Sequence, residues 1–149
     1  MFKLKTLLTA TLIIFAANLS ANAATIGYAD FQKVLSQYSV ARNAYKDIDN
    51  KKMELQQYMI DKEKQFKTIE SPIQRKTFED QIQKEFKAKE EKVYNLIVQK
   101  EKEIKTNVLA ASKAVATNKK LDVILDYGVV YAGGVDVTND IIQYLNTKK

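Results

Sequence analysis

The carboxylates of Asp122 and Asp126 are the only side chains of this sequence whose spacing suggests acid–base chemistry. They lie four residues apart on a short stretch with the composition of a strand, so both can point to the same face. A pair of this kind could supply a general acid and a general base. We favour the simpler interpretation that the two residues mark the solvent-facing ends of a short strand. The sequence therefore does not predict an enzyme.

The missing residue types exclude several other kinds of site. The 149 residues include no histidine and no cysteine. This excludes a zinc finger, a catalytic triad built on imidazole, a haem ligated through either residue and any disulfide bond. No glycine-rich nucleotide-binding motif and no nucleophile elbow occurs. We expect neither a metal ion nor a cofactor.

Charge is the more informative property. Residues 40–120 contain 19 basic and 13 acidic side chains, whereas the rest of the chain beyond residue 23 has 3 basic and 5 acidic ones. A basic segment suits an acidic partner, such as an anionic lipid surface, lipopolysaccharide, nucleic acid or an acidic protein. The alternative is a solvated helix surface with ion pairs between successive turns. Nucleic acid is the least expected of these partners, because the start of the chain predicts export.

Apolar and basic side chains are mixed in the middle of the chain. The apolar ones are more aromatic and more flexible than a minimal two-helix seam requires. Those left over from packing could offer an adaptable surface to unfolded or membrane-bound proteins. Ordinary packing between helices is the alternative. The candidate binding residues are Met59, Phe66, Ile69, Phe78, Ile82, Phe86, Lys62, Lys64, Lys67, Arg75, Lys76, Lys84 and Lys87.

Residues 1–23 have the pattern of a secretory signal peptide. Lys3 and Lys5 precede an apolar run, and Ala21-Asn22-Ala23 fits a small-x-small processing site, so cleavage is expected after Ala23. An uncleaved membrane anchor is the alternative, which we disfavour because the apolar run is short for a bilayer span. The mature chain is expected to act outside the cytoplasm.

Both ends of the mature chain contain short stretches that favour strands. The first covers residues 25–29, and two more cover residues 121–126 and 129–132, next to glycines that predict turns. A last helix is expected to begin at Thr138, whose hydroxyl can cap it.

The segment between these ends favours two long helices. The first is expected to begin at Asp30 as its N-cap and to follow a heptad pattern. The second should begin at Ser71-Pro72, where serine at the N-cap, proline at N1 and Gln74 at N3 form a capping box. The two heptad rows are Phe31, Tyr38, Tyr45, Lys52, Met59 and Phe66, and Val34, Ala41, Ile48, Leu55, Lys62 and Ile69.

The second helix has a different apolar period. Ile82 and Phe86 recur eleven residues later as Val93 and Ile97, and the repeat continues toward Val115. An eleven-residue period drifts in the opposite sense to a heptad, so the two helices cannot form one regular coiled coil.

Neither part of the chain can build a large core alone. A lone helix pair buries one stripe on each helix, and the strands are too few for a stable monomeric sheet. Oligomerisation through the strand-bearing ends would remedy both deficits. We therefore predict a predominantly helical α+β chain. Its long antiparallel helical hairpin arm (residues 40–118) projects from a small oligomerising β body formed by both chain ends (residues 24–39 and 119–149).

Both ends of the mature chain also carry a resemblance to a known family. The start reads IGYADFQKVL over residues 26–35, and the end reads LDVILD over residues 121–126 and DVTNDI over residues 136–141. The chain resembles the Skp/OmpH family of periplasmic chaperones along nearly the whole mature length. The resemblance implies a homotrimer whose β body carries three arms around a cavity. Such proteins hold unfolded outer-membrane β-barrel polypeptides without ATP.

The resemblance also assigns residues to the oligomeric body. The last helix would pack on that body through its apolar face. A lipopolysaccharide site of some members is not transferred, because Asn95 and Leu96 stand where arginines would be expected. The oligomerisation residues are Ile26, Tyr28, Val123, Leu125, Val129, Tyr131, Ile141 and Leu145.

A second function remains open at this stage. The chain could be a structural or adhesive coiled-coil protein of the envelope that contacts anionic surfaces. Such a protein would associate with the envelope but would not protect unfolded clients from aggregation.

Overall fold

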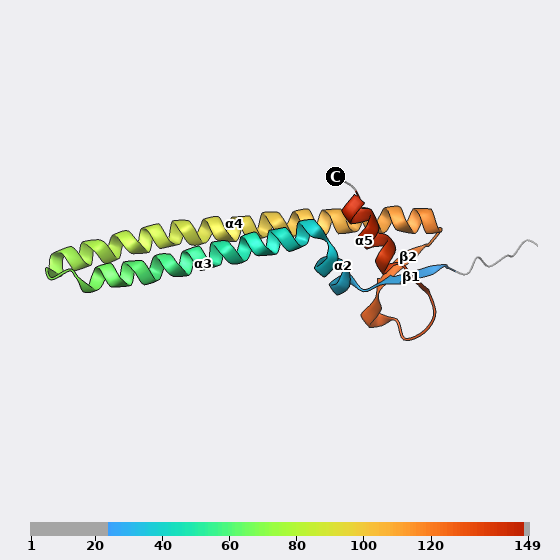
Figure 1. The fold of residues 1–149 in the computed structure, drawn as a ribbon, viewed down its shortest axis with the longest axis horizontal. Helices are drawn as coiled ribbons and strands as arrows, with labels where there is room; N and C mark the ends of the chain where they lie inside the picture. The colour runs from blue at the N-terminus through green and yellow to red at the C-terminus, as the bar shows by residue number, and fades with distance from the viewer. Residues whose placement is uncertain (1–23, 148–149) are drawn as a thin grey trace, which may run out of the picture.

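The computed structural model describes residues 24–147. The expected signal peptide and its cleavage site at Ala23 lie outside the described residues. Figure 1 shows a long two-helix arm attached to a small body that contains both ends of the described chain. The fold is mostly helical, with one small parallel sheet.

The sheet joins the two ends of the chain. Its strands are β1 (Ile26–Ala29), β2 (Val123–Asp126) and β3 (Val135–Asp136). The strand order is β2-β1-β3, and both neighbours pair with β1 in parallel. The stretches expected at residues 25–29 and 121–126 therefore do form strands.

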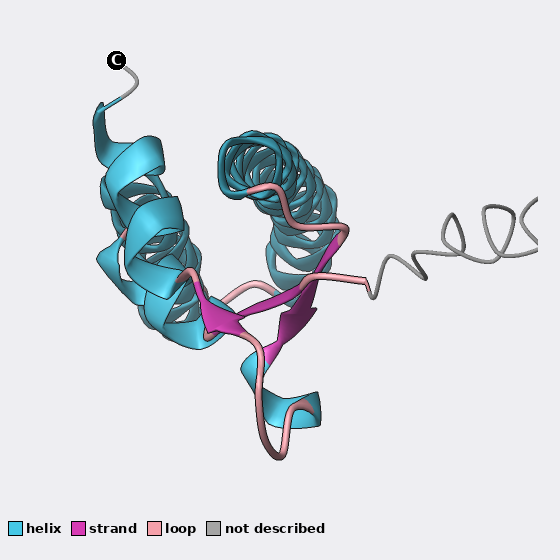
Figure 2. Ribbon diagram, turned by 90° about the vertical axis from the view of Figure 1, so that its right-hand side faces the viewer, coloured by secondary structure: helices cyan, strands magenta, loops and turns pink. Residues whose placement is uncertain are grey.

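The two faces of the sheet have different surroundings. Gly27 and Ala29 face the core: a Cβ built on Gly27 would meet the side chain of Leu121 at 2.6 Å, and both Leu121 and Ala29 belong to the buried core. Residues paired in register share a face, so Ile26 and Tyr28 lie with their β2 partners on the opposite face. Figure 2 shows α4 and α5 on one side of the sheet and the loop between β2 and β3 on the other.

The strand expected at residues 129–132 is wrong. Residues Tyr127–Val129 form a 3-10 helix, and the third strand begins only at Val135. Asp126 causes the change, because its Oδ1 accepts a hydrogen bond from the backbone N of Gly128 at 2.8 Å and turns the chain directly after β2. Gly133 and Gly134, with φ of 79° and 85°, then bring the chain back to β3.

Four helices complete the described fold: α2 (Phe31–Gln37), α3 (Ser39–Lys67), α4 (Pro72–Lys119) and α5 (Thr138–Thr147). Asp30 caps α2 as expected, since its Oδ1 accepts a hydrogen bond from the backbone N of Lys33 at 2.9 Å.

The prediction of a single helix from Asp30 onward is wrong, because the helix is interrupted at Tyr38. Tyr38 has extended backbone angles, φ −76° and ψ 114°. Asn146 of α5 holds this break: its Nδ2 donates to the carbonyl of Gln37 and its Oδ1 accepts from the backbone N of Ser39, both at 3.0 Å. The backbone groups that the break leaves free are therefore satisfied by a residue near the other end of the chain.

α3 and α4 lie alongside each other and are joined by residues 68–71 (Figure 1). α4 begins at Pro72 with Ser71 as its N-cap residue, but the Ser71 side chain makes no capping hydrogen bond. The expected capping box is therefore not formed. Arg75 stabilises the connection instead, because its Nε donates to the carbonyl of Ile69 at 2.6 Å and its guanidinium lies over the Phe66 ring.

The two heptad rows contribute unequally to the seam near the body. Ala41 and Ile48 of the row that starts at Val34 are buried. In the row that starts at Phe31, Tyr38 is buried but Tyr45 is exposed. Ala44, one position before Tyr45, is buried in its place. The break at Tyr38 explains the difference, since α3 starts anew there and its buried face is set by contact with α4. The eleven-residue pattern of α4 does follow its partly or fully buried face.

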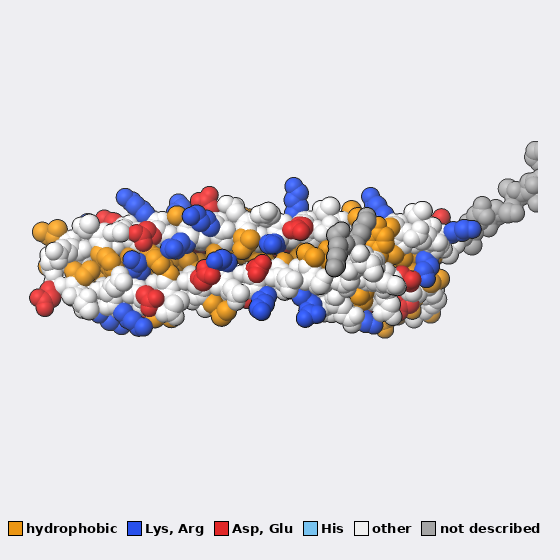
Figure 3. Space-filling model, turned by 45° about the horizontal axis from the view of Figure 1, so that its top comes forward, with side chains coloured by type: hydrophobic (Ala, Val, Ile, Leu, Met, Phe, Trp, Pro, Cys, Tyr) orange, Lys and Arg blue, Asp and Glu red, His pale blue; other side chains and the backbone are white. Residues whose placement is uncertain are grey.

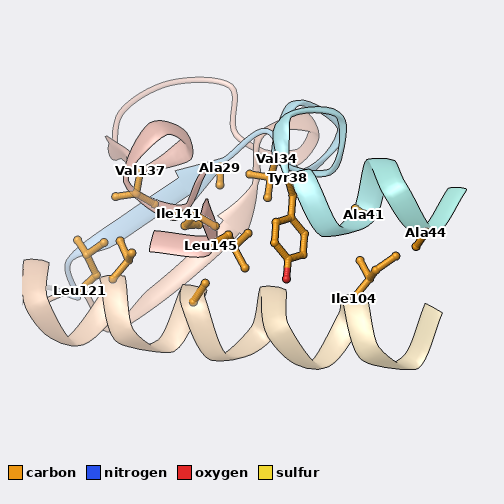
Figure 4. Close-up of a cluster of buried hydrophobic side chains, with 12 residues drawn as sticks. Ala29, Val34, Tyr38, Ala41, Ala44, Ile104, Leu121, Val137, Ile141 and Leu145 are labelled. Atoms are coloured by element: carbon orange, nitrogen blue, oxygen red, sulfur yellow. The ribbon is translucent and has the colours of Figure 1, made fainter. Parts of the chain in front are cut away.

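The core lies where the arm meets the body. Tyr38, Val34, Ile104, Ile141 and Leu145 belong to one cluster of buried side chains there. Figure 4 shows the Tyr38 ring pointing toward α4, where its hydroxyl accepts a hydrogen bond from Asn107 Nδ2 at 3.1 Å.

Thr138 joins the first strand to the last helix. It is the first residue of α5, and its hydroxyl does not cap this helix as expected. The hydroxyl oxygen accepts a hydrogen bond from the backbone N of Asp30 at 3.0 Å and donates to Asp136 Oδ1 at 2.6 Å. Asp136 Oδ1 also accepts from the backbone N of Thr138 at 2.9 Å, so this carboxylate takes the capping role.

Candidate client-binding surface on the arm

The outer part of the arm has no closed core. Among residues 49–103, which we call the distal arm, no side chain reaches full burial, and the seam residues are at best half-buried. Ile73 at the tip is 81% exposed, and Met53, Ile60 and Tyr94 are also exposed apolar residues. Figure 3 shows hydrophobic side chains along the arm, interspersed with basic and acidic ones. This surface is amphipathic along its length.

A groove of about 400 Å³ lies near the tip between α3 and α4. Four of the sequence-predicted residues, Met59, Lys62, Phe66 and Ile82, line it together. Ile60 was not predicted but is also part of the lining. The complete lining is Met59, Ile60, Lys62, Glu63, Phe66, Glu79, Ile82 and Gln83.

A polar cluster crosses the arm next to this groove. The hydroxyl of Tyr58 on α3 donates to Glu85 Oε2 on α4 at 2.6 Å, and Gln81 Nε2 donates to Glu85 Oε1 at 2.8 Å. Lys62 Nζ lies 3.9 Å from Glu85 Oε2 and 5.4 Å from the centre of the Tyr58 ring. Lys89 Nζ lies 4.9 Å from the same ring. Cations therefore cover the aromatic ring while its hydroxyl is bound to a carboxylate.

This cluster shifts two acid–base equilibria in opposite directions. Desolvation, the hydrogen bond to Glu85 and the negative charge of Glu85 raise the pKa of Tyr58 to about 12. The hydrogen bonds from Tyr58 and Gln81, followed by the nearby lysines, lower the pKa of Glu85 below its ordinary value. The neutral phenol and the ionised carboxylate thus stabilise each other and hold α3 against α4.

The other predicted arm residues lie in two kinds of environment. Ile69 in the connection and Phe78 and Phe86 on α4 are half-buried. Lys64 and Lys67 are exposed and form ion pairs within α3, with Asp61 at 3.8 Å and Glu63 at 2.7 Å. The remaining predicted basic residues are exposed on α4: Arg75, Lys76, Lys84 and Lys87.

Sequence reasoning missed Tyr58 and Glu85. The heptad row placed Met59 on the seam, whereas the structure turns Tyr58 toward α4 and leaves Met59 40% exposed. The sequence did contain a signal for this packing, because the aromatic Tyr58 directly precedes the flexible Met59. Exposed Tyr94 on α4 was missed as well.

The chain matches one protein family. The family described as "Outer membrane protein (OmpH-like)" matches residues 25–145. The chain belongs to this Skp/OmpH family. No curated protein matches it closely enough to count as a relative.

In this OmpH-like protein, the sheet face opposite to Gly27 and Ala29 is partly exposed to solvent. Ile26 and Val123, which are partners in register, are 40% and 38% exposed. Tyr28 is half-buried and its ring lies 6.0 Å from that of Tyr127. Leu125 is half-buried beside it. The four predicted strand residues therefore share one apolar face.

The remaining predicted oligomerisation residues are in different places. Val129 and Tyr131 lie outside the sheet and are exposed on the loop between β2 and β3. Ile141 and Leu145 are buried in the core of the same chain, where they pack α5 against its neighbours. In this OmpH-like chain, the exposed loop and the buried helix face are thus distinct surfaces.

The carboxylates of Asp122 and Asp126 accept hydrogen bonds at the two ends of β2 in the OmpH-like body. Asp122 Oδ2 accepts a hydrogen bond from the backbone N of Thr25 at 2.7 Å, and Asp126 binds Gly128. Both carboxylates therefore have structural partners. Over residues 24–147, no acidic cluster has the arrangement of a metal site. Within the same range, no helix has the length and apolar character of a bilayer span.

Proposed function

We propose that this OmpH-like protein is an ATP-independent periplasmic chaperone that holds unfolded outer-membrane β-barrel proteins and prevents their aggregation. Membership of the family supports the chaperone class and the kind of client. The expected signal peptide supports delivery of the chain to the periplasm.

The observation that carries the proposal is the open seam of the distal arm. A two-helix arm that served only as a spacer would have no need of large apolar side chains exposed at its surface. This arm instead exposes Met59, Ile60 and Ile73. Lys62 lines the same groove as Met59 and Ile60. Such a surface can bind extended segments weakly at many points, through apolar contact with flexible side chains and attraction of acidic groups.

We also propose that the protein acts as a homotrimer formed through the body. The partly exposed apolar face with Ile26, Tyr28, Val123 and Leu125 would be covered by other copies. The number of copies rests on the family resemblance. Three arms around one space would surround a client and shield it from other unfolded chains.

The test is aggregation suppression by the mature chain, residues 24–149. A urea-unfolded outer-membrane β-barrel protein is diluted into buffer with and without the mature protein, and light scattering is followed. A chaperone should abolish scattering at one trimer per client, whereas an unrelated coiled coil of similar charge should not. Unchanged scattering would reject the proposal and favour a structural envelope protein.

A further inference from the structure

Methionine is the only sulfur-containing residue type of this chain. Met1 lies within the expected signal peptide, so the mature chain carries two thioethers, Met53 and Met59, and both are on α3. Because the sequence has no cysteine, no thiol competes with these thioethers for an oxidant. Oxidation of the mature chain at sulfur can therefore occur only at these two positions.

The two methionines have different surroundings. Met59 is 40% exposed and lines the groove near the tip of the arm, together with Phe66 and Ile82. Met53 is 57% exposed and is not part of that lining. A small oxidant can thus contact both side chains, but only at Met59 does the modified atom belong to the groove.

The modification is a two-electron oxidation by a peroxide. A lone pair of the thioether sulfur attacks one oxygen of hydrogen peroxide, so that an S–O bond forms while the O–O bond breaks. The leaving hydroxide takes the proton of the transferred hydroxyl and becomes water. Sulfur loses two electrons, the peroxide gains two, and the product is methionine sulfoxide, whose side chain is polar.

The composition of the groove makes this change consequential. Its lining contains four apolar residues, Met59, Ile60, Phe66 and Ile82, and four polar or charged ones. Oxidation of Met59 removes one of the four apolar residues, and the one whose unbranched side chain adapts best to different partners. A client side chain that enters the oxidised groove must also displace water from the sulfoxide oxygen, which is unfavourable unless that oxygen gains a new hydrogen bond.

We infer that Met59 is an oxidation site that controls the client groove: its thioether favours client binding and its sulfoxide weakens it. This inference rests on the proposed chaperone function and adds a chemical control to the same surface. The control is reversible, because methionine sulfoxide reductases return each sulfoxide epimer to the thioether.

Oxidation of the mature protein with hydrogen peroxide tests the inference. Peptide mass spectrometry follows the conversion of each methionine, and fluorescence titration with a labelled, urea-unfolded outer-membrane β-barrel protein measures client affinity. Complete conversion should weaken client binding roughly threefold to tenfold, while circular dichroism shows an unchanged helix content. Treatment with the two methionine sulfoxide reductases, one for each epimer, should restore the original affinity.

Two single variants locate the effect. Met59→Leu keeps an apolar side chain of similar volume, so its client affinity should stay close to that of the natural chain and should not change with peroxide. Met53→Leu is the matched control and should lose affinity on oxidation as the natural chain does. A loss that persists in Met59→Leu would overturn the inference.

Protection by the client gives a second readout. A bound client should slow the oxidation of Met59 more than that of Met53, because only Met59 lies in the groove. Oxidation of Met59 at the same rate with and without client would contradict its place in the client contact.

The titration also separates this inference from the proposed function. An untreated natural chain that does not bind the unfolded client would overturn both. A chain that binds the client equally well before and after complete oxidation of Met59 would overturn the oxidation control alone and leave the chaperone function standing.

Discussion

Replacing Thr138 by valine should destabilise the body by about 2–3 kcal/mol, although valine has nearly the same shape. The Thr138 hydroxyl is buried and makes two hydrogen bonds, one from the backbone N of Asp30 and one to Asp136 Oδ1. These bonds connect the end of β1 to the start of α5. Their loss would weaken the attachment between the two chain ends, which the pairing of β1 with β2 and β3 would still hold together.

The magnitude follows from the two bonds taken separately. The partly buried N–H of Asp30 would lose its acceptor, at a cost of about 1–2 kcal/mol. The Asp136 carboxylate would lose a hydroxyl donor but keep the backbone N of Thr138 and gain water, so about 1 kcal/mol is expected for this bond. The sum corresponds to a fall of roughly 8–12 °C in Tm for a chain of this size.

Thermal and urea unfolding at fixed protein concentration measure this change. Thr138→Ser keeps the hydroxyl and should lose less than about 1 kcal/mol. Thr117→Val, which removes an exposed hydroxyl bound only to the carbonyl of Lys113, should change stability by less than about 0.5 kcal/mol. If Thr138→Val were as stable as Thr117→Val, the reasoning would be refuted.

The pH dependence gives an independent check. The Thr138 hydroxyl and then its backbone N lower the pKa of Asp136. A lowered folded-state pKa adds stability above the ordinary pKa of the carboxyl group, and this stability is lost as the pH falls through the lowered value. The difference between the natural chain and Thr138→Val should therefore narrow in acid. A difference that stayed constant would show that Asp136 does not contribute.

Three further predictions concern the arm. The pKa of Tyr58 is raised to about 12, so the neutral phenol contributes stability that is fully present below pH 10. This contribution should be lost as the pH rises from 10 to 12. In Glu85→Gln, spectrophotometric titration should show Tyr58 ionising at a lower pH. Replacing Phe66 and Ile82 together by serine should reduce client affinity at least about tenfold in fluorescence titrations, while the melting of the body is unchanged. Client binding should weaken as salt rises above physiological strength, because exposed charges are screened beyond about 8 Å. Binding that ignored salt would assign the affinity to apolar contacts alone.

Local signals predicted several boundaries correctly. Asp30 caps a helix and Pro72 begins one, because each position depends on the few residues around it. The strands at Ile26–Ala29 and Val123–Asp126 were predicted from short apolar runs beside turns. In each case the physical cause of the boundary lies within the segment itself.

A distant contact accounts for one wrong prediction, and a local turn accounts for another. The break at Tyr38 depends on Asn146, which is more than a hundred residues away in the sequence. The strand expected at residues 129–132 has a suitable composition, but the turn made by Asp126 takes the chain out of the sheet. Local sequence contains no sign of the first effect, because it depends on a distant partner for two backbone groups, whereas the second depends on the order of Asp126 and Gly128 and not on composition.

The candidate arm surface was predicted only in part, because some of its contacts depend on how the two helices pack against each other. Met59, Phe66 and Ile82 could be grouped from helical periodicity, and they do line one groove. The pairing of Tyr58 with Glu85 could not be predicted, because it depends on how α3 is rotated against α4. A shift of one residue in that rotation exchanges Tyr58 for Met59.

The parallel sheet imposes an order of assembly on the chain. Asp122 at the start of β2 holds Thr25 before β1, across 97 residues of sequence. During synthesis the first strand therefore exists long before its neighbours, whereas α3 and α4 can pair as soon as residues 72–119 are made. Closing so long a loop is slow compared with pairing adjacent helices. The helical arm should therefore fold early, and the body that joins both chain ends should fold last.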